Sequence, residues 1–511
     1  MTDRIFWGDL HSHCAISYGY GSIERAFAAA RGHLDFATVT GHATWHDMPV
    51  DHERYGRIID FHQEGFERLA ANWEHVQRVV EENNVDGEFA ALLSYEWHSI
   101  RNGDHNIYYP GSSGDIIEAD DLDTLEQRLG GKAAFLIPHH IGYGPGNRGI
   151  DWQQFDERRS PVVEIFSGHG GSERDGGPFP MYHTMGARTY EGTVAHGLAL
   201  GKRFGFVAGT DHHGGYPGHY GEGRTAVFAP ELSRAAILEA IAKRHCYAVT
   251  GDKIELSFAV DGAPMGDAIV DMAGGAASSA SSGKVRRFIS YRVRGCDVID
   301  RLEIVKNNEV IHRAFPQLSE LKSGEPLKVR IEWGWGDKDE SITWDGRLRV
   351  EGGSILAVEP CFNGDPVLAP TEEGVAVSGD TIHQFQLASE SSLHWASRTR
   401  GNPSPMVRGT NALIVELEAG PTSRLDFTVN GRSFSHSVGE LLAGSRSHGM
   451  RGWRSEMVLV HRAVPESRFL LDAELTDEPS NRDTDFYYLR VAQENGQWAW
   501  GSPVWVSRRD S

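Results

Sequence analysis

The histidines of this chain are concentrated in its first half, where 19 of the 25 precede residue 250. An imidazole nitrogen binds borderline divalent ions and also carries protons near neutral pH. The earliest pattern, GDLHSH at 8–13, places His11 and His13 two residues apart and therefore on the same side of an extended chain. One metal ion can accept both imidazoles, so this spacing predicts the first part of a metal site.

Further candidate ligands follow the later strand-like segments of the first half. In chain order they are His42, Glu96, His105, His139, Glu164, Asp211 and His213. A single His-x-His pair is weak evidence for a metal, but ligand types at six strand edges argue against chance. Carboxylates can bridge two ions whereas imidazole cannot, so Glu96 and Asp211 are the candidate bridging ligands and the principal catalytic residues.

A hydrolytic site also needs groups that move protons and groups that bind the substrate. His46 and His140 are candidates for proton transfer, because an acid must protonate the leaving group. Arg148 and Arg224 lie near the motifs, where a guanidinium can bind an anionic substrate through two hydrogen bonds. The other histidines of the motifs are more simply interpreted as surface or structural residues. This interpretation applies to His98, His169, His183, His196 and His212 and, as regards metal ligation, to His140.

Short strand patterns alternate with helical patterns up to about residue 250, which is typical of parallel strands joined by crossover helices. The expected strands are 5–10, 36–40, 90–95, 106–109, 134–137, 162–166 and 204–208. The expected helices are 22–31, 53–82, 122–129, 190–200 and 231–244. Ligand sites form at the carboxyl ends of such strands, so this α/β architecture would bring the candidate ligands together.

The second half has a different pattern, in which alternating segments are separated by Asp-Gly and Asn-Gly turns. This pattern predicts all-β structure, so the fold class is α/β over 1–250 followed by one or two β-sandwich domains. One sandwich is expected from 251–341 together with 461–511, and 342–460 could form an inserted second sandwich. The low-complexity segment 274–283 is expected to be a mobile loop within this region.

The tryptophans of the β-rich half are the other residues whose type suggests binding. They are Trp333, Trp335, Trp395 and Trp453. An indole face can support a sugar ring, so these residues could form a sugar-binding platform. Tryptophans are common in sandwich cores, however, and we interpret this half as structural.

Composition limits the partners of the chain. The formal charge of −21 repels phosphate backbones and anionic lipid, so neither nucleic acid nor a membrane is an expected partner. The sequence has no run of about 18 uncharged apolar residues, and its four cysteines include no CxxC pair. We therefore expect a cytoplasmic protein with reduced thiols that acts on a small molecule, and the sequence leaves its oligomeric state open.

The order of the candidate ligands resembles that of the PHP (polymerase and histidinol phosphatase) metallohydrolases. Their pattern has His-x-His at the first strand end, a histidine closing the second strand, then Glu, His, His and a final Asp-x-His, and the match covers 1–250. The phrases YEWHS, IPHHIGYGPG, VEIFSGHGGSE and GTDHHGGYPG are similar to an uncharacterised bacterial branch that joins a PHP domain to a β-rich C-terminal region. This second similarity would extend the resemblance to the end of the chain.

The resemblance implies a distorted (β/α)7 barrel that binds two or three Mn, Fe or Zn ions, usually for phosphoester hydrolysis. It implies one ion held by His11, His13, Glu96 and Asp211, another by Glu96, His105 and His139, and a third by His42 and His213, with Glu164 as a lesser candidate. Two departures bear on the third ion. Many relatives have Asp-His where this chain has Gly41-His42, and the segment CAISYGYG at 14–21 offers no histidine or carboxylate after the His-x-His pair. The site could therefore bind two ions rather than three, or His46 could supply the ligand that the segment 14–21 lacks.

These observations favour a metal-dependent phosphoesterase in which a metal-bound hydroxide attacks a small phosphorylated molecule. A metallohydrolase of carboxylic amides, esters or lactones is the alternative, because the same ions polarise a carbonyl group. A second alternative is a non-catalytic metal-binding scaffold with a β-rich binding module. Fold analogy alone does not separate these functions.

Overall fold

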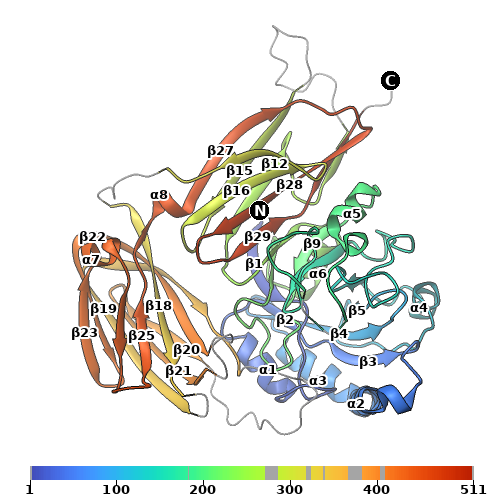
Figure 1. Ribbon diagram of the computed structural model, residues 1–511, viewed down its shortest axis with the longest axis horizontal. Coiled ribbons are helices and arrows are strands. Elements are labelled where there is room, and N and C mark those ends of the chain that lie inside the picture. Colours follow the sequence, from blue (N-terminus) through green and yellow to red (C-terminus); the bar gives the residue numbers. More distant parts are fainter. Residues whose placement is uncertain are drawn as a thin grey trace.

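A computed structural model describes residues 3–181, 183, 185–270, 286–317, 324–337, 340–365, 383–402 and 409–508. Helices gather around a mixed sheet in the blue-to-green half of the chain, whereas the yellow-to-red half is almost entirely strands (Figure 1). This arrangement confirms the expected division into an α/β first half and a β-rich second half. The expected mobile loop at 274–283 lies outside the described residues.

The strands of the first half form one part of a large mixed sheet and a small second sheet (Figure 1). Their bounds are β1 (Arg4–Asp9), β2 (Phe36–Thr38), β3 (Gly41–Trp45), β4 (Ala90–His98), β5 (His105–Tyr109), β6 (Phe135–Pro138), β7 (Val162–Ser167), β8 (Gly170–Gly171), β9 (Gly205–Ala208), β10 (Arg224–Ala229) and β11 (Cys246–Val249). β1, β2 and β4 are parallel neighbours, β3 pairs in parallel with the end of β4, and β7 pairs in parallel with β9. Residues that follow these parallel strands therefore meet at one edge.

Antiparallel pairs interrupt this arrangement, which differs from the parallel strands that the sequence pattern predicts. β5 is antiparallel to both β4 and β6, and β10 is antiparallel to β1 and β11. Only residues 99–104 connect β4 to β5, and a parallel crossover needs about a dozen residues or more, so the chain must return antiparallel. The described strands form an open path, β11-β10-β1-β2-β4-β5-β6, beside the separate β7–β9 sheet, where a seven-stranded barrel was expected.

Helices cover the sheet and begin mostly at polar capping residues. Their bounds are α1 (Ile23–Ala30), α2 (His52–Ala71), α3 (Trp73–Asn83), α4 (Leu122–Leu129), α5 (Val194–Ala199) and α6 (Arg234–Ala242). The side chains of Ser22, Asp51, Asp121 and Ser233 accept backbone N–H groups at the starts of α1, α2, α4 and α6. The expected helix 53–82 is two helices that meet at Asn72. No helix among the described residues is long and apolar enough to cross a membrane.

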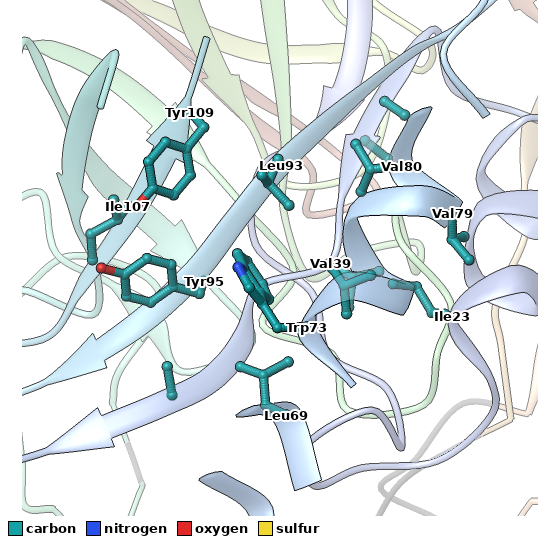
Figure 2. Close-up of a cluster of buried hydrophobic side chains, with 14 of the residues drawn as sticks. Ile23, Val39, Leu69, Trp73, Val79, Val80, Leu93, Tyr95, Ile107 and Tyr109 are labelled. Atoms are coloured by element: carbon teal, nitrogen blue, oxygen red, sulfur yellow. The ribbon is translucent and has the colours of Figure 1, made fainter. Parts of the chain in front are cut away.

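A core of apolar side chains joins α1, α2 and α3 to one face of β4 and β5 (Figure 2). Leu93 and Tyr95 of β4 lie in this core with Leu69 of α2 and Trp73 of α3, and the Trp73 indole N–H donates to the Gly114 carbonyl at 2.6 Å. Successive strand residues point to opposite faces, so the even-numbered residues of β4 face away from these helices. Packing of the odd-numbered face therefore fixes where the even-numbered polar side chains point.

The second half adds two facing sheets that share a core with β10 and β11. Their strands are β12 (Glu255–Val260), β13 (Ala263–Pro264), β14 (Ala268–Val270), β15 (Arg287–Arg294), β16 (Ile299–Lys306), β17 (Glu309–Ala314), β27 (Leu470–Asp477), β28 (Thr484–Gln493), β29 (Trp498–Gly501) and β30 (Val504–Ser507). β13, β12, β15 and β27 form a four-stranded sheet, whereas β16, β28, β29 and β30 belong to the large sheet of the first half. β29 pairs with β11, so hydrogen bonding is continuous across residue 250.

A nine-stranded sheet forms the remaining unit and encloses its own core. Its strands are β18 (Pro326–Trp335), β19 (Ser341–Cys361), β20 (Gln384–Ser389), β21 (Ser392–Arg400), β22 (Thr410–Val429), β23 (Arg432–Ser437), β24 (Arg446–Gly449), β25 (Glu456–Val460) and β26 (Val464–Pro465), with helices α7 (Val438–Ala443) and α8 (Glu466–Phe469). Trp333 and Trp395 stack in the core with ring centroids 5.3 Å apart. β18 precedes residue 342, so this sheet draws on more of the chain than the interval 342–460.

We predict that Arg287→Ala destabilises the fold by about 3–5 kcal/mol, because it removes the nearer of the two cations beside the buried carboxylate of Asp485. The Arg287 Nη1 and Asp485 Oδ2 atoms are 2.5 Å apart, and each side chain is 1% exposed. Denaturant unfolding measures the change. Arg292→Ala is the matched control on the same strand, since its pair with Asp472 is exposed and should contribute about 0–1 kcal/mol. Equal losses in the two variants would contradict the assignment.

Candidate metal centre

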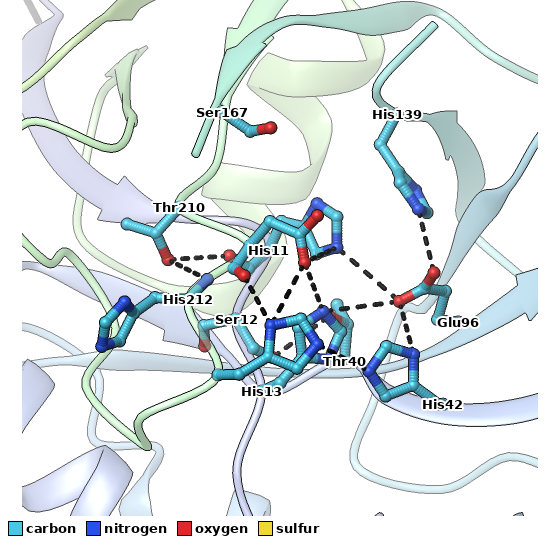
Figure 3. Close-up of polar contacts among 12 residues, drawn as sticks. His11, Ser12, His13, Thr40, His42, Glu96, His139, Ser167, Thr210 and His212 are labelled. Carbon is cyan, nitrogen blue, oxygen red and sulfur yellow. Dashed lines mark hydrogen bonds and ion pairs between the residues drawn. The ribbon is translucent and has the colours of Figure 1, made fainter. Parts of the chain in front are cut away.

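Residues that follow the parallel strands converge on the carboxylate of Glu96, near the end of β4 (Figure 3). His11 and His13 follow β1, whereas His42 lies in β3 and His139 follows β6. Two backbone hydrogen bonds, Asp211 N to His11 O at 2.7 Å and His13 N to His212 O at 2.9 Å, bring the segment after β9 to the same place. The structure therefore unites ligand candidates that are up to about two hundred residues apart.

The first group consists of His11, His13 and Asp211, whose ligand atoms lie within 4.8 Å of one another, and Glu96 lies beside it, as the resemblance implies. Nε2 of His13 lies 2.9 Å from Asp211 Oδ1 and 3.4 Å from Glu96 Oε2. Nε2 of His11 lies 3.4 Å from Asp211 Oδ1 and 3.7 Å from Glu96 Oε2. Neither His11 Nε2 nor Glu96 Oε2 has a hydrogen-bond partner among the described residues, although both are buried. Buried ligand atoms that face one point and have no hydrogen-bond partner, as His11 Nε2 and Glu96 Oε2 do, fit a cation at that point.

The second group surrounds the other oxygen of Glu96. Nε2 of His139 lies 3.0 Å from Glu96 Oε1, as the expected pairing of these residues requires. Glu96 and His139 also form a group with Asp104 and His140, in which one ligand atom of each residue lies within 4.8 Å of the others. Asp104 was not a sequence candidate, and it takes the place in this group that His105 was expected to fill.

The third group is His13, His42 and His213, whose ligand atoms lie within 4.8 Å of one another. Nε2 of His42 and Nε2 of His213 are 3.2 Å apart, and Nδ1 of His42 lies 3.1 Å from Glu96 Oε2. The ring of Tyr18 stacks on His42 at a centroid distance of 3.6 Å. The expected pair His42 and His213 is therefore in place.

His105 is a correction to the predicted ligand set. It is the first residue of β5, where it pairs with Trp97, whereas Asn106 is the partner of Glu96. Side chains alternate along the strand, so Asn106 shares the face of Glu96 and His105 points to the opposite face. The His105 Nδ1–H donates to the Gly103 carbonyl at 3.0 Å, and no group of potential ligands among the described residues includes His105.

Three residues outside the predicted site contact the centre: His98 and His169, which we interpreted from the sequence as surface or structural residues, and Asp104. His98 lies two residues beyond Glu96 on the same face of β4, and its Nδ1 is 3.2 Å from Glu96 Oε1. Asp104 lies 3.0 Å from the same nitrogen of His98. His169 Nε2 lies 2.9 Å from Asp211 Oδ2. Side chains two residues apart on a strand share a face, so the position of His98 relative to Glu96 could have identified it from the sequence. His169 could have been identified because it follows β7 closely, as other residues of the centre follow their strands.

The remaining predicted site residues lie around or outside the centre. His140 contacts it from the edge, with its Nε2 3.4 Å from Asp104 Oδ2. Arg148 also binds Asp104, its Nε at 2.9 Å, and its guanidinium lies 4.9 Å from the ring centroid of Trp45. His46 is placed outside the centre, stacked on Trp97 at 5.6 Å.

Arg224 is a second correction, because it is 0% exposed and cannot meet a substrate. Its Nε and Nη2 donate to the Gly218 carbonyl at 3.1 and 2.7 Å, and its Nη1 donates to the Gly251 carbonyl at 3.1 Å. A buried guanidinium is retained when its donors are satisfied. Arg224 therefore holds two loops together, a role that its position at the start of a strand does not reveal.

Glu164 fixes the ring of His11. Its Oε2 lies 2.8 Å from Nδ1 of His11, and its Oε1 accepts the backbone N–H of His140 at 3.2 Å. A carboxylate on the far nitrogen of a metal-binding imidazole fixes the ring and its tautomer, and it leaves the near nitrogen free to bind a cation. The structure thus places Glu164 behind His11 rather than at the point where the ligand atoms converge.

The carboxylates of the centre are held in their charged form. Burial raises the pKa of Glu96, but the imidazoles of His98 and His42 outweigh burial and hold this pKa well below its usual range. Burial also raises the pKa of Asp211, and His11 leads the groups that hold it well below its usual range. Both side chains are therefore ready anionic ligands at neutral pH.

Burial holds several of the imidazoles neutral. Burial, reinforced by neighbouring histidines, lowers the pKa of His139 to about 4 and that of His213 to about 3. Burial lowers the pKa of His11 too, but the charges of Asp211 and Glu164 outweigh burial and raise it well above its usual value. Since metals bind deprotonated ligands, a cation at this centre would displace a proton from His11.

Comparisons with known proteins cover part of the chain. No family model matches it. An uncharacterised protein of Chlamydia pneumoniae is 36% identical over 184 residues, which are 34% of this chain and 28% of that protein. Uncharacterised proteins of Chlamydia muridarum and Chlamydia trachomatis are 36% and 34% identical over 180 residues, each covering 33% of this chain. The chain thus spans 28% of the length of the curated relatives it matches.

One solved structure is similar over a longer part of the chain. It is a two-domain protein from Bacteroides vulgatus described as containing a predicted PHP-like metal-dependent phosphoesterase. The match has a TM-score of 0.31 and 16% sequence identity, and it covers 59% of this chain and 79% of the other.

We predict that His139→Ala weakens metal binding by more than about a hundredfold, because a lost ligand should cost more than a lost outer partner. Plasma mass spectrometry after dialysis would measure Mn and Zn per folded chain. His105→Ala is the matched control from the adjacent strand and should retain the wild-type content. A loss of metal from the His105 variant alone would show that His105 is a ligand, as the sequence predicted, and would contradict the pairing of Asn106 with Glu96.

We predict that Glu164→Gln weakens metal binding by about 10–100-fold, since the amide can still accept the His11 proton but no longer carries charge. Competition against a fluorescent chelator would measure the affinity. Glu157→Gln, at an exposed carboxylate, is the control and should bind as the wild type does. Unchanged affinity in the Glu164 variant would show that this carboxylate does not act on the metal.

Proposed function

We propose that the first half of the chain is a PHP-type metal-dependent hydrolase that cleaves phosphoesters of a small molecule. The observation that carries the proposal is the position of the Glu96 carboxylate. Its Oε1 faces His139 at 3.0 Å, while its Oε2 faces His42 at 3.1 Å and His13 at 3.4 Å. A carboxylate with different imidazoles at its two oxygens is suited to bridge two ions.

The residues present fit divalent cations of the Mn, Fe or Zn type. The set combines nitrogen and oxygen donors, which these ions accept and which Ca²⁺ or Mg²⁺ would not select. Glu96 and Asp211 supply two negative charges inside a buried cluster, and His11 Nε2 is buried without a hydrogen-bond partner. His11, His13, Glu96 and Asp211 would hold one ion, and Glu96, Asp104 and His139 would help to hold a second. The group of His13, His42 and His213 allows a third.

Ions bound there would acidify a water molecule and offset the negative charge that develops on the phosphoryl oxygens. Nε2 of His169 lies 2.9 Å from Asp211 Oδ2, and the hydroxyl of Tyr143 lies 2.7 Å from Nδ1 of the same histidine. This chain of contacts orients the carboxylate before substrate arrives. His169 is partly exposed, so it lies on the side of the centre that a substrate can reach.

His140 and Arg148 are the proposed proton-transfer and substrate-binding residues. His140 directs Nε2 toward Asp104, which leaves Nδ1 as its proton-accepting nitrogen, and this atom is buried without a hydrogen-bond partner. Arg148 contacts Asp104 and His98, so its positive charge lies at the edge of the centre, where an anionic substrate would meet it. His46 and Arg224, which lie away from the converging ligands, have no role in this proposal.

We predict that protein loaded with Mn or Zn hydrolyses p-nitrophenyl phosphate or a related phosphoester and that Asp211→Asn lowers the rate by more than about a hundredfold, since the metals lose a charged ligand. Removal of the metal with a chelator should abolish turnover, and added Mn should restore it. The His105→Ala variant is the control and should keep most of the activity. Hydrolysis of carboxylic amides, esters or lactones without any phosphoesterase activity would overturn the assignment to phosphoesters.

A further inference from the structure

A cavity of about 560 Å³ lies where the first half, the sandwich that follows it and the nine-stranded sheet meet. Tyr220 lines it from the first half, Asp297, Glu494 and Asn495 from the sandwich, and Arg330, Glu332, Trp335, His461 and Arg462 from the nine-stranded unit. Its volume falls within the range of small-molecule sites. None of its lining residues belongs to the metal centre.

Both arginines of the cavity wall lie beside carboxylates, and Asp297 adds a third carboxylate to the wall. Arg330 Nη1 donates to the Tyr220 hydroxyl at 2.8 Å, and Arg330 Nε lies 3.7 Å from Glu332 Oε2. The same oxygen of Glu332 lies 2.8 Å from His461 Nε2, and Arg462 pairs with Glu494. Because no positive charge is left in excess, the cavity is unsuited to a phosphate or another strong anion.

Trp335 places an aromatic residue in the cavity wall. Strand alternation would direct Trp335 to the same side as Trp333, which is fully buried in the core. The alternation ends at residue 334, because Gly334 has φ 145° and Trp335 itself has φ 63°. This left-handed conformation is strained for a large side chain, and such strain tends to persist where a residue has a function. The bend places Trp335 at the cavity, partly exposed.

Two polar side chains of the cavity wall, Tyr220 and Asn495, are fixed by hydrogen bonds to one buried carboxylate. Asn495 donates from Nδ2 to the buried carboxylate of Asp252 at 2.7 Å, and the Tyr220 hydroxyl donates to the other oxygen of that carboxylate at 2.7 Å. These bonds hold both side chains in place before a ligand binds, which reduces the entropy lost on binding. A matching ligand has hydroxyl groups at its edge, no net charge and an apolar face that can stack on an indole.

We propose that this cavity binds a neutral saccharide, with one ring face against Trp335 and its hydroxyls on the surrounding polar groups. Binding needs neither metal nor hydrolysis, so the proposal stands or falls independently of the phosphoesterase assignment. The ligand could be a free sugar or part of a glycoside, and these two sources share the chemistry that the wall recognises.

The full-length protein would be tested by calorimetry and saturation-transfer NMR with maltose, cellobiose and N,N′-diacetylchitobiose, each beside its methyl glycoside. We expect at least one of these probes to bind with transfer to its ring protons, and Trp335→Ala to weaken it by about tenfold or more. The matched control is Trp453→Ala, because Trp453 is 92% exposed and lies outside the cavity. Preference for the methyl glycoside over the free sugar would identify a glycoside as the ligand.

A second variant separates ligand binding from a packing role. Glycine adopts positive φ without strain, so Trp335→Gly should melt at a higher temperature than Trp335→Ala while both lose the sugar. The proposal is overturned if no probe binds the wild type, if the variants bind as it does, or if inorganic phosphate displaces the sugar. Loss of cooperative melting in both variants would make Trp335 a core residue and would overturn it as well.

Discussion

The carboxylate of Glu96, buried among imidazoles from separate parts of the chain, is the interaction on which the rest of the structure depends. A buried charge is costly unless other groups compensate it, and imidazole nitrogens of His13, His42 and His139 face this carboxylate at 3.0–3.4 Å. The same geometry crowds several imidazole nitrogens around two oxygens, without hydrogen bonds that satisfy all of them. A divalent cation bound there would relieve this crowding, and its binding would then be thermodynamically linked to folding of the centre.

The convergence at Glu96 requires that distant loops be tied to β1, and Asp9 performs this task. Its fully buried carboxylate accepts the backbone N–H of His11 and Thr210 at 3.0 Å each, the Thr210 hydroxyl at 2.6 Å and the Gly218 N–H at 2.7 Å. These bonds hold the segment after β9 against the segment after β1. They explain how Asp211, with a left-handed φ of 55°, keeps its carboxylate beside His13.

Sequence patterns predicted most of the converging residues because those residues end or follow apolar segments that are recognisable without a fold. His105 was wrongly predicted as a ligand because neighbouring residues of a strand point to opposite faces. Only the pairing of Glu96 with Asn106 shows that Asn106, and not His105, faces the centre. The error at Arg224 arose from burial, because an arginine near a motif has the same sequence signature whether its partners are backbone carbonyls or a substrate. The antiparallel β5 follows from a connection that is too short for a crossover, a constraint that the sequence contained but that strand assignment alone did not use.

The β-rich half also helps to shape the centre, although its residues carry none of the ligands. Glu173 lies four residues after His169 on the segment that follows β7, and it is buried against β28 and β29. Its Oε1 accepts the Tyr488 hydroxyl at 2.8 Å and an N–H of Arg490, and its Oε2 accepts the Trp500 indole N–H at 3.1 Å. The segment that brings His169 to Asp211 is therefore anchored in the second half. Because β29 also continues the sheet of β11, the two halves share hydrogen bonds and a core, and the position of His169 depends on residues more than three hundred positions away in the sequence.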